Sequence, residues 1–189
     1  MADRRFDPAK SDRLDSPERR SQLPPEMVLK ELSIQSSDKV LDLGAGTGYF
    51  TLPVAQMTKE TIYALDIEPK MLESLSARIE EQHLSNVEVL KGDIQEIPLP
   101  SQEVDRIIAS MVLHEVDFSK TLKEIHRVLK PQGTCLCLEW ERKESEEGPP
   151  LHHRVKSTDM EQVMEAEGLM PLRTRLLTEN HYMILAKKK

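Results

Sequence analysis

Short apolar runs alternate along the chain with longer segments in which apolar residues recur every three or four positions. Short apolar runs are typical of strands buried in a sheet, and the 3–4 spacing is typical of helices with one buried face. The pattern predicts strands over residues 40–43, 62–67, 87–90, 104–109 and 134–140, a final hairpin over 169–177 and 181–186, and helices over 26–32, 49–57, 71–82, 122–129 and 160–166.

The alternation of strand and helix predicts an α/β fold with a doubly wound, mostly parallel sheet. Right-handed crossovers place the helices of such a fold on both faces of the sheet. Lys130-Pro131-Gln132-Gly133 is predicted to end the helix before the fifth strand. Ligands bind these sheets beyond the carboxyl ends of the strands, near the point at which strand order reverses. The turn after the strand at 40–43 is therefore the first candidate for a binding site.

That turn carries three alternating glycines, Gly44, Gly46 and Gly48. Glycine lacks a Cβ and adopts positive φ without strain, so a ligand can lie directly against such a loop. The helix that follows adds free N–H groups and a partial positive charge, which suit a carboxylate or a phosphate. The dinucleotide-binding pattern G-x-G-x-x-G would place its third glycine where this chain has Tyr49. Taken alone, the loop could also be a turn that binds no ligand.

The chain of 189 residues is long enough for one domain with a full core. Residues 1–22 mix both charges densely and hold few apolar side chains, chiefly Phe6 and Leu14. We therefore predict an N-terminal arm over residues 1–22 and a single domain over residues 23–189. The arm is either flexible or a lid that closes over a ligand, with Phe6 and Leu14 as its apolar anchors.

The formal net charge of −7 argues against binding of a nucleic-acid backbone as the main task. No stretch of about 18 apolar residues occurs, so no membrane span is expected, and the N-terminal residues lack the apolar segment of a signal peptide. Cys135 and Cys137 would share one face of a strand, which disfavours a disulfide and favours a reducing cytoplasm. Lys187-Lys188-Lys189 is interpreted as a solvated tail. The oligomeric state stays open.

Acidic residues follow the second and third predicted strands. Asp66, or in second place Glu68, lies about 20 residues beyond the glycines, where a carboxylate can accept hydrogen bonds from ribose hydroxyls. Asp93 could accept a hydrogen bond from an exocyclic amine such as that of adenine, with Ile67 and Ile94 as apolar walls. Each acid alone could equally cap a helix or lie in a solvated turn. Together with the glycine loop, they predict a pocket for an adenosine with an attached anionic group.

Five segments, in the same order, resemble the motifs of class I S-adenosylmethionine-dependent methyltransferases. Residues 40–48 resemble the first motif of this family and residues 64–72 its ribose-binding motif. Residues 92–100, 104–115 and 122–133 resemble the adenine-side motif, the fourth-strand segment, and the helix and turn before the fifth strand. The nearest branch contains ubiquinone and menaquinone biosynthesis C-methyltransferases and related small-molecule enzymes. The resemblance implies a seven-stranded sheet with an antiparallel last strand, and S-adenosylmethionine as the cofactor.

The resemblance also implies roles for individual residues. The glycine loop would pass beneath the methionine part of the cofactor, with Asp42 near its ammonium group. Asp66 would bind the ribose hydroxyls, and Asp93 with the N–H of the next residue would bind adenine. Ser110 and Met111 would border the sulfonium and its methyl group. The residues implied for cofactor binding are Asp42, Gly44, Ala45, Gly46, Gly48, Asp66, Ile67, Asp93, Ile94, Ser110 and Met111.

Methyl transfer from a sulfonium is an in-line displacement, in which the protein mainly aligns the acceptor and excludes water. A general base can assist but is not obligatory. His114, which follows the fourth strand, is the candidate base; alternatively it caps a helix or packs in the core. Glu115, Glu139 and Glu141 are weaker candidates and are interpreted as surface or capping acids.

His152 and His153 lie in a loop beyond the fifth strand, and such loops can face a substrate. Adjacent side chains point in different directions, so both are interpreted as surface residues. A structural zinc site formed with Cys135 and Cys137 is disfavoured, because the spacing is not C-x-x-C and the cysteines lie in a predicted buried strand. No metal is therefore predicted.

The sequence does not reveal the acceptor, but it predicts a cytoplasmic S-adenosylmethionine-dependent methyltransferase that acts on a small molecule. Transfer to protein or nucleic acid is the first alternative. It is disfavoured by the acidic balance and by Ser110-Met111-Val112-Leu113, which stands in place of an Asn/Asp-Pro-Pro-Tyr/Phe signature. A module that binds the cofactor without turnover is a second alternative. A nicotinamide dehydrogenase is disfavoured by Tyr49.

Overall fold

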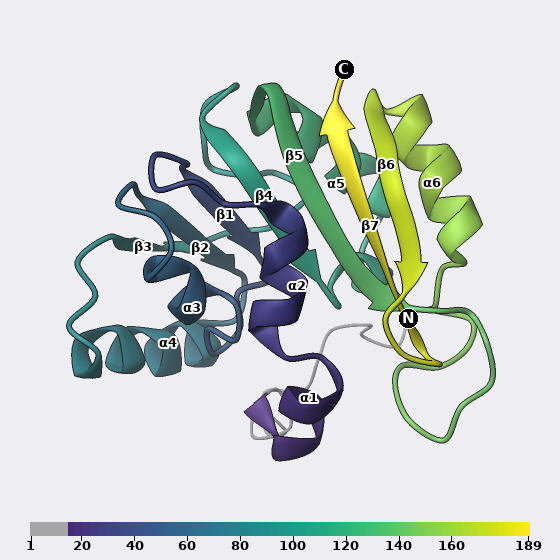
Figure 1. Ribbon diagram of the computed structural model, residues 1–189, viewed down its shortest axis with the longest axis horizontal. Helices are drawn as coiled ribbons and strands as arrows, with labels where there is room; N and C mark the ends of the chain where they lie inside the picture. Colours follow the sequence, from purple (N-terminus) through teal and green to yellow (C-terminus); the bar gives the residue numbers. More distant parts are fainter. Residues whose placement is uncertain (1–14) are drawn as a thin grey trace.

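The computed structural model of the protein describes residues 15–189 (Figure 1). It contains a seven-stranded sheet in the order β3-β2-β1-β4-β5-β7-β6. β7 pairs antiparallel with β5 and with β6, and the other neighbouring strands are parallel. The predicted α/β fold with an antiparallel last strand is thus confirmed. The strands are β1 (Val40–Leu43), β2 (Ile62–Asp66), β3 (Val87–Lys91), β4 (Val104–Ser110), β5 (Leu129–Trp140), β6 (Leu169–Leu176) and β7 (His181–Lys188).

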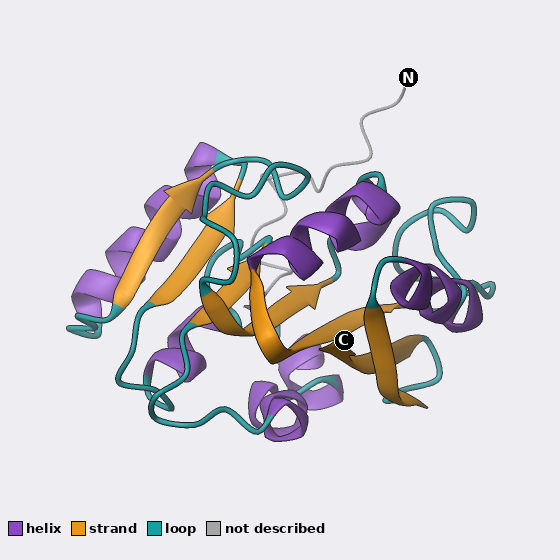
Figure 2. Ribbon diagram, turned by 90° about the horizontal axis from the view of Figure 1, so that it is seen from above, coloured by secondary structure: helices purple, strands orange, loops and turns teal. Residues whose placement is uncertain are grey.

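Helices cover both faces of the sheet, as the alternating pattern predicts (Figures 1 and 2). In Figure 1, α2 crosses in front of the sheet and α5 lies behind it. β1 is buried along its whole length because it lies in the middle of a sheet covered on both faces. The helices are α1 (Pro17–Gln22), α2 (Pro25–Leu32), α3 (Thr51–Ala55), α4 (Pro69–Glu81), α5 (Phe118–Val128) and α6 (Ser157–Ala166), with a short 3₁₀ helix, η2 (Leu113–Glu115).

The structure corrects several predicted boundaries; for example, α4, α5 and α6 begin two to four residues earlier than predicted. The helix predicted over 49–57 is shorter, because α3 covers only Thr51–Ala55. α5 ends at Val128, and Leu129 is already the first residue of β5, paired with Val104. The segment predicted to be a turn at 130–133 therefore belongs to the strand. It contains a register shift against β4, and Gln132 adopts a left-handed φ of 68° there.

Lys188 contradicts the interpretation of the C-terminal lysines as a solvated tail. Its side chain is buried, and Nζ donates to the carbonyl oxygens of His126 at 2.6 Å and Leu129 at 2.7 Å. These carbonyls lie at the end of α5, where unpaired acceptors and the negative end of the helix dipole favour a cation. Lys188 thereby fastens the last strand to α5.

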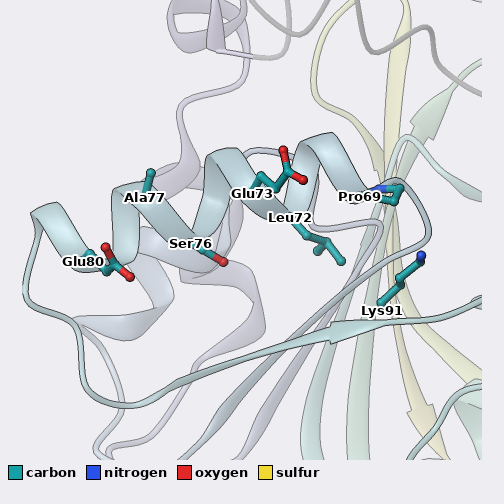
Figure 3. A pocket seen from close by; sticks show the side chains of 7 residues that line it. All are labelled: Pro69, Leu72, Glu73, Ser76, Ala77, Glu80 and Lys91. Atoms are coloured by element: carbon teal, nitrogen blue, oxygen red, sulfur yellow. The ribbon is translucent and has the colours of Figure 1, made fainter.

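A cavity of about 480 Å³ lies along α4, beside the edge strand β3 (Figure 3). Figure 3 shows Pro69 and Lys91 at one end of the cavity and Glu80 at the other. A second cavity, of about 690 Å³, lies within the loop after β5, around Arg154. Within residues 15–189, no helix is both long and apolar enough to cross a membrane.

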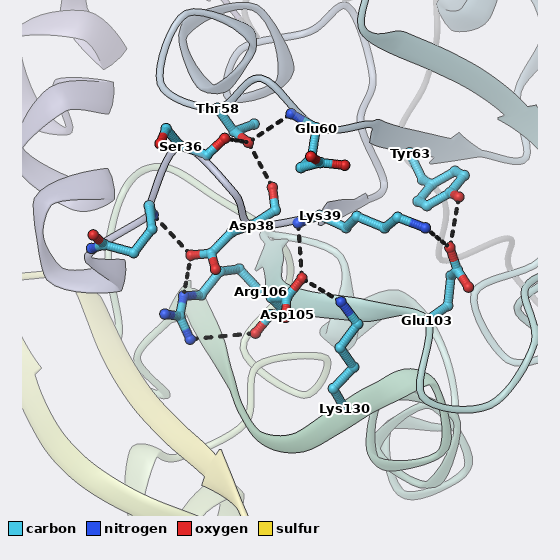
Figure 4. Close-up of polar contacts among 11 residues, drawn as sticks. Ser36, Asp38, Lys39, Thr58, Glu60, Tyr63, Glu103, Asp105, Arg106 and Lys130 are labelled. Carbon is cyan, nitrogen blue, oxygen red and sulfur yellow. Dashed lines mark hydrogen bonds and ion pairs between the residues drawn. The ribbon is translucent and has the colours of Figure 1, made fainter.

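A polar network joins the amino ends of the central strands (Figure 4). The Asp105 carboxylate accepts a hydrogen bond from the backbone N–H of Lys39 at 2.9 Å and pairs with Lys130 Nζ at 2.7 Å. Arg106 Nε lies 3.0 Å from the carboxylate of Asp38. Because Asp38 and Lys39 precede β1 while Asp105 and Arg106 belong to β4, these contacts fix the two strands against each other. The opposite, carboxyl ends are thereby held in register.

We expect Asp105→Ala to lower the free energy of unfolding by about 1–3 kcal/mol, because the Lys39 N–H loses its acceptor. Urea unfolding followed by circular dichroism measures the change. The control is Glu165→Ala, which removes an exposed carboxylate from α6 and should change stability by less than about 0.5 kcal/mol. Equal stability of the two variants would show that the network does not hold the strands.

Candidate functional site

The loop between β1 and α3 turns through conformations that favour glycine. Gly44, Gly46 and Gly48 have φ values of 70°, 54° and 93°, a region that residues with a Cβ rarely adopt. The N–H groups of Gly44 and Ala45 donate to the carbonyl oxygen of Leu65, at 2.9 and 3.0 Å. The loop is therefore fixed against the carboxyl end of β2.

Asp66 ends β2 and faces this loop. Its Oδ2 accepts a hydrogen bond from the N–H of Gly46 at 2.8 Å, and its Oδ1 accepts one from the N–H of Glu68 at 2.9 Å. A carboxylate has about four acceptor positions, so these two contacts leave capacity for ligand hydroxyls. Glu68, the second choice of the sequence reasoning, instead caps α4 through the N–H of Lys70. The structure thus brings Asp66, rather than Glu68, to the glycine loop.

Asp93 lies on the same edge of the sheet. The N–H of Gly92 donates to the carbonyl oxygen of Asp66 at 3.1 Å, which places the end of β3 beside the end of β2. Asp93 accepts the N–H of Gln95 at 2.8 Å. The side chain of Ile94 packs in the core and is 5% exposed, whereas Ile67 is 40% exposed at this edge.

Asp42 is a buried acid, with 2% of its surface exposed. Its Oδ2 accepts a hydrogen bond from the hydroxyl of Thr51 in α3 at 2.6 Å. Burial raises the pKa of Asp42 to about 6; the Thr51 hydrogen bond opposes this shift and the charge of Asp66 adds to it. A cationic ligand group beside Asp42 would favour its ionised form.

Two buried hydroxyl oxygens at this edge, Thr47 Oγ1 and Ser110 Oγ, have no hydrogen-bond partner in the part of the chain that the structure describes. Thr47 belongs to the glycine loop, and Ser110 ends β4. Met111 follows with a left-handed φ of 56°. Unpaired buried hydroxyls and a left-handed non-glycine residue both cost free energy, and such costs cluster at ligand sites. Polar groups of a bound ligand could pair with both hydroxyls.

His114 lies in η2, directly after β4, and is 7% exposed. Its Nδ1 lies 2.8 Å from Oε2 of Glu139, whose Oε1 accepts the N–H of Leu113 at 2.8 Å. Glu139 is only 1% exposed, so it is a buried capping acid and not a surface residue. Glu141 caps α6 instead, because its carboxylate accepts the N–H of Ser157.

The Glu139 carboxylate controls the protonation of His114. Burial lowers the pKa of His114, but the charge and hydrogen bond of Glu139, with help from Glu115, raise it further, so the pKa lies above its ordinary value. Nδ1 is occupied by Glu139, whereas Nε2 lies 3.9 Å from the nearest oxygen of Glu115, beyond hydrogen-bond distance. Nε2 is therefore the atom available for proton exchange.

The pattern of residues along β5 indicates that Glu139 is buried, although the sequence analysis interprets it as a surface or capping acid. Cys135, Cys137 and Glu139 alternate along β5, and both cysteines are free and buried in the same core. An acid that continues the buried period-two face of a strand needs a polar partner inside the protein.

Within residues 15–189, no group of three or more His, Cys, Asp or Glu side chains is placed to hold a metal ion.

The loop after β5 is built around Arg154, for which the sequence held no signal. Its guanidinium donates to the carbonyl oxygens of Lys143, Glu147 and Pro149 at 2.6–2.8 Å. It also lies 5.1 Å from the ring centroid of Trp140, at the end of β5. The rings of His152 and His153 lie 4.3 Å apart, so the expectation that these side chains diverge is wrong.

The two cavities are not lined by the residues of the glycine loop or by Asp66, Asp93 or His114. The cavity along α4 reaches Lys91 at the end of β3 but is not lined by the glycine loop, and the second cavity belongs to the Arg154 loop. Cavity size is a weaker indicator here than shared position at the sheet edge, where buried charges and unpaired hydroxyls meet. We therefore assign the candidate site to the carboxyl ends of β1, β2, β3 and β4.

Known proteins resemble this chain. A family model described as a methyltransferase domain matches residues 41–137. Demethylmenaquinone methyltransferase from Geobacillus sp. (strain WCH70) is 32% identical over 117 residues, covering 60% of this chain and 50% of that relative. The protein of the same name from Staphylococcus saprophyticus is 33% identical over 115 residues, covering 59% of this chain and 48% of that relative.

A solved structure resembles the whole chain. The crystal structure of a SAM-dependent methyltransferase from Aquifex aeolicus has a TM-score of 0.90 and 30% sequence identity, and it covers 98% of this chain and 100% of its own. In contrast, the chain spans about half the length of the curated relatives it matches. The stretch of this chain that matches the family model includes the glycine loop, Asp66, Asp93 and His114.

We expect the contribution of Asp42 to the free energy of unfolding to decrease as the pH rises. Its folded pKa of about 6 exceeds the ordinary value of 3.8. Its contribution is therefore fully present below pH 3.8 and is lost as the pH rises through about 6. The difference in unfolding free energy between the native chain and Asp42→Asn should change by on the order of 2–3 kcal/mol across this window. Urea unfolding from pH 4 to pH 8 measures it, and a difference independent of pH would contradict a raised pKa.

Proposed function

The chain belongs to the family of S-adenosylmethionine-dependent methyltransferases, with S-adenosylmethionine as its cofactor, and from this premise we propose that it methylates a small molecule. The observation that carries the proposed site is the 2.8 Å contact between the Asp66 carboxylate and the N–H of Gly46. It joins an acid suited to ribose hydroxyls to a loop on which a ligand can lie. Asp93, on the neighbouring strand end, lies where the adenine would follow.

The remaining cofactor contacts follow from the same edge. Asp42 faces the amino-acid end of the site, where the ammonium group of the cofactor offsets the cost of its buried charge. The unpaired hydroxyls of Thr47 and Ser110 fit a ligand with several polar atoms. Bound S-adenosylmethionine supplies an electrophilic methyl group on a sulfonium. Ser110 and Met111, at the end of β4, border that group in our proposal.

We assign proton removal from the acceptor to Nε2 of His114. Bound S-adenosylmethionine would supply the methyl group and keep the electron pair of the sulfonium bond, and Nε2 of His114 would take up the proton that leaves the acceptor atom. Glu139 holds Nδ1 at 2.8 Å and stabilises the imidazolium that results. Because Glu139 is nearly inaccessible to water, its charge acts on His114 with little screening.

The proposed acceptor is a small molecule with an acidic hydroxyl or carbon, because a histidine base is useful only when a proton must leave. The names of the relatives from Geobacillus and Staphylococcus, demethylmenaquinone methyltransferases, support a quinone-like ring. Two free, buried cysteines support the proposed cytoplasmic location. Phe6 and Leu14, the apolar anchors of the lid considered for residues 1–22, lie outside the described residues.

We expect Asp66→Asn to weaken binding of S-adenosylhomocysteine by about 10–100-fold, because the charged acceptor of the ribose hydroxyls is lost. Isothermal titration calorimetry measures the affinity. Glu68→Gln is the matched control and should bind within about twofold of the native chain, a factor that corresponds to only a few tenths of a kcal/mol. A loss of equal size in both variants would remove Asp66 from the site, and no binding by the native chain would refute the proposed cofactor site.

We expect His114→Ala to reduce turnover by about 10²–10⁴-fold while affinity for S-adenosylhomocysteine stays unchanged. Turnover is measured with methyl-labelled S-adenosylmethionine and a panel of demethylated quinols, phenols, amines and thiols. His83→Asn, an exposed histidine beyond α4, is the control. Unchanged turnover in His114→Ala would end its proposed role, and binding without turnover on any acceptor would favour a non-catalytic module.

The pH profile separates a base from a packing histidine. Native turnover should rise with pH through a pKa above the ordinary 6.5, because Nε2 accepts a proton only from the neutral ring. Glu139→Gln removes the negative charge that raises this pKa and leaves burial to lower it, so the rise should move to lower pH. A profile that stays in place in Glu139→Gln would show that His114 does not set it.

A further inference from the structure

Residues 15–23, which include α1 and which we call the N-terminal strap, lie against the glycine loop. The hydroxyl of Tyr49, the residue after the last loop glycine, donates to the carbonyl oxygen of Leu23 at 2.9 Å. The guanidinium carbons of Arg19 and Arg20 lie 4.3 and 5.4 Å from the centroid of the same ring, which are cation–π distances. Because the loop follows the carboxyl end of β1, the strap lies on the same side of the sheet as the candidate site.

One guanidinium connects the strap to the glycine loop. Nη1 of Arg78 in α4 donates to the carbonyl oxygen of Thr47 at 2.9 Å, and its Nη2 donates to the carboxylate of Asp15 at 2.8 Å. Thr47 belongs to the loop and Asp15 is the first residue of the strap, so both are held by the same side chain. The side chains of Arg78 and Asp15 are 27% and 24% exposed, so water reaches this ion pair.

The two ends of the strap are attached in different ways. Leu23 and Tyr49 are 2% and 5% exposed, belong to the same hydrophobic cluster and share a buried hydrogen bond. α1, in contrast, contains no buried residue. A segment with few buried apolar contacts can detach without unfolding the core. The Leu23 end of the strap is therefore fixed, and the Asp15 end is the one that can be released.

Thr47 links the strap to the surface on which a ligand would lie. Its carbonyl oxygen accepts from Arg78, whereas its Oγ1 is buried and has no hydrogen-bond partner among residues 15–189. Release of Asp15 would remove one of the two acceptors that hold the Arg78 guanidinium. The attachment of the strap therefore affects the loop residue whose hydroxyl can serve a ligand.

We propose that the ion pair of Asp15 and Arg78 is the latch of the N-terminal strap, and that its opening lets the cofactor enter and leave the glycine loop. This inference rests on the cofactor site proposed above. Arg78 is then a positioning residue, because it contacts the loop and the strap and not the reacting atoms. A partly exposed ion pair has a small net free energy, so the latch opens readily while Leu23 stays in place.

The test measures the rates of ligand exchange as well as the affinity. Surface plasmon resonance on the immobilised protein gives the association and dissociation rate constants of S-adenosylhomocysteine. Asp15→Asn removes the charge of the latch and keeps the shape of the side chain. It should raise both rate constants about fivefold, a factor that corresponds to about 1 kcal/mol, and leave Kd within about twofold, because the strap restricts passage in both directions.

Arg20→Met is the matched control. It removes the other cation that pairs with Asp15, whose side chain is 49% exposed, and it keeps the latch. Both rate constants should stay within about twofold of the native values, because an exposed ion pair contributes little. Arg78→Met and the double variant with Asp15→Asn complete a cycle. The double variant should exchange ligand no faster than Arg78→Met alone, because the pair is already broken.

The outcomes separate this inference from the proposed function. Unchanged rates in Asp15→Asn would overturn the latch, as would additive effects in the double variant. Faster dissociation with an unchanged association rate would make the pair a support of the bound state and would also overturn it. These results leave the cofactor site standing, because the native chain still binds. Failure of the native chain to bind would overturn both proposals. If Arg78→Met does not fold, Asp15→Asn and Arg20→Met decide.

Discussion

The candidate site depends on a hydrogen bond of 2.8 Å from the N–H of Gly46 to the carboxylate of Asp66. This bond joins the loop after β1 to the end of β2. It forms because parallel pairing aligns Leu43 of β1 with Leu65 of β2, so both strands end at the same edge. The bonds from Gly44 and Ala45 to the Leu65 carbonyl oxygen hold the rest of the loop. Without these anchors the glycines would make a mobile turn, because each residue has wide conformational freedom.

The amino ends of the central strands, opposite the site, form the rigid base for that arrangement. There Asp105 and Asp38 are paired with cations and with backbone N–H groups, so their charges are compensated (Figure 4). Lys188 pairs with the carbonyls at the end of α5 in the same way. Such contacts stabilise the strand order.

At the carboxyl ends of the strands, where the candidate site lies, some buried polar groups of the described residues lack hydrogen-bond partners. Asp42 is buried beside Asp66 with a raised pKa, and the hydroxyls of Thr47 and Ser110 have no partner in the described part of the chain. A protein tolerates these costs where a ligand repays them, and the rest of the fold must supply the stability that is lost. The zwitterionic and hydroxyl-bearing cofactor proposed here would pair with each of these groups.

Local sequence patterns predict most of the secondary structure, the glycine loop and the strand-end positions of Asp66 and Asp93, because hydrophobic period and turn chemistry are local properties. Packing between distant segments, in contrast, makes Leu129 the start of β5, places Glu139 against His114 and brings Arg19 to Tyr49. The partners in those contacts lie far apart along the chain. Their meeting depends on strand register and on the way α1 packs, which no local pattern encodes.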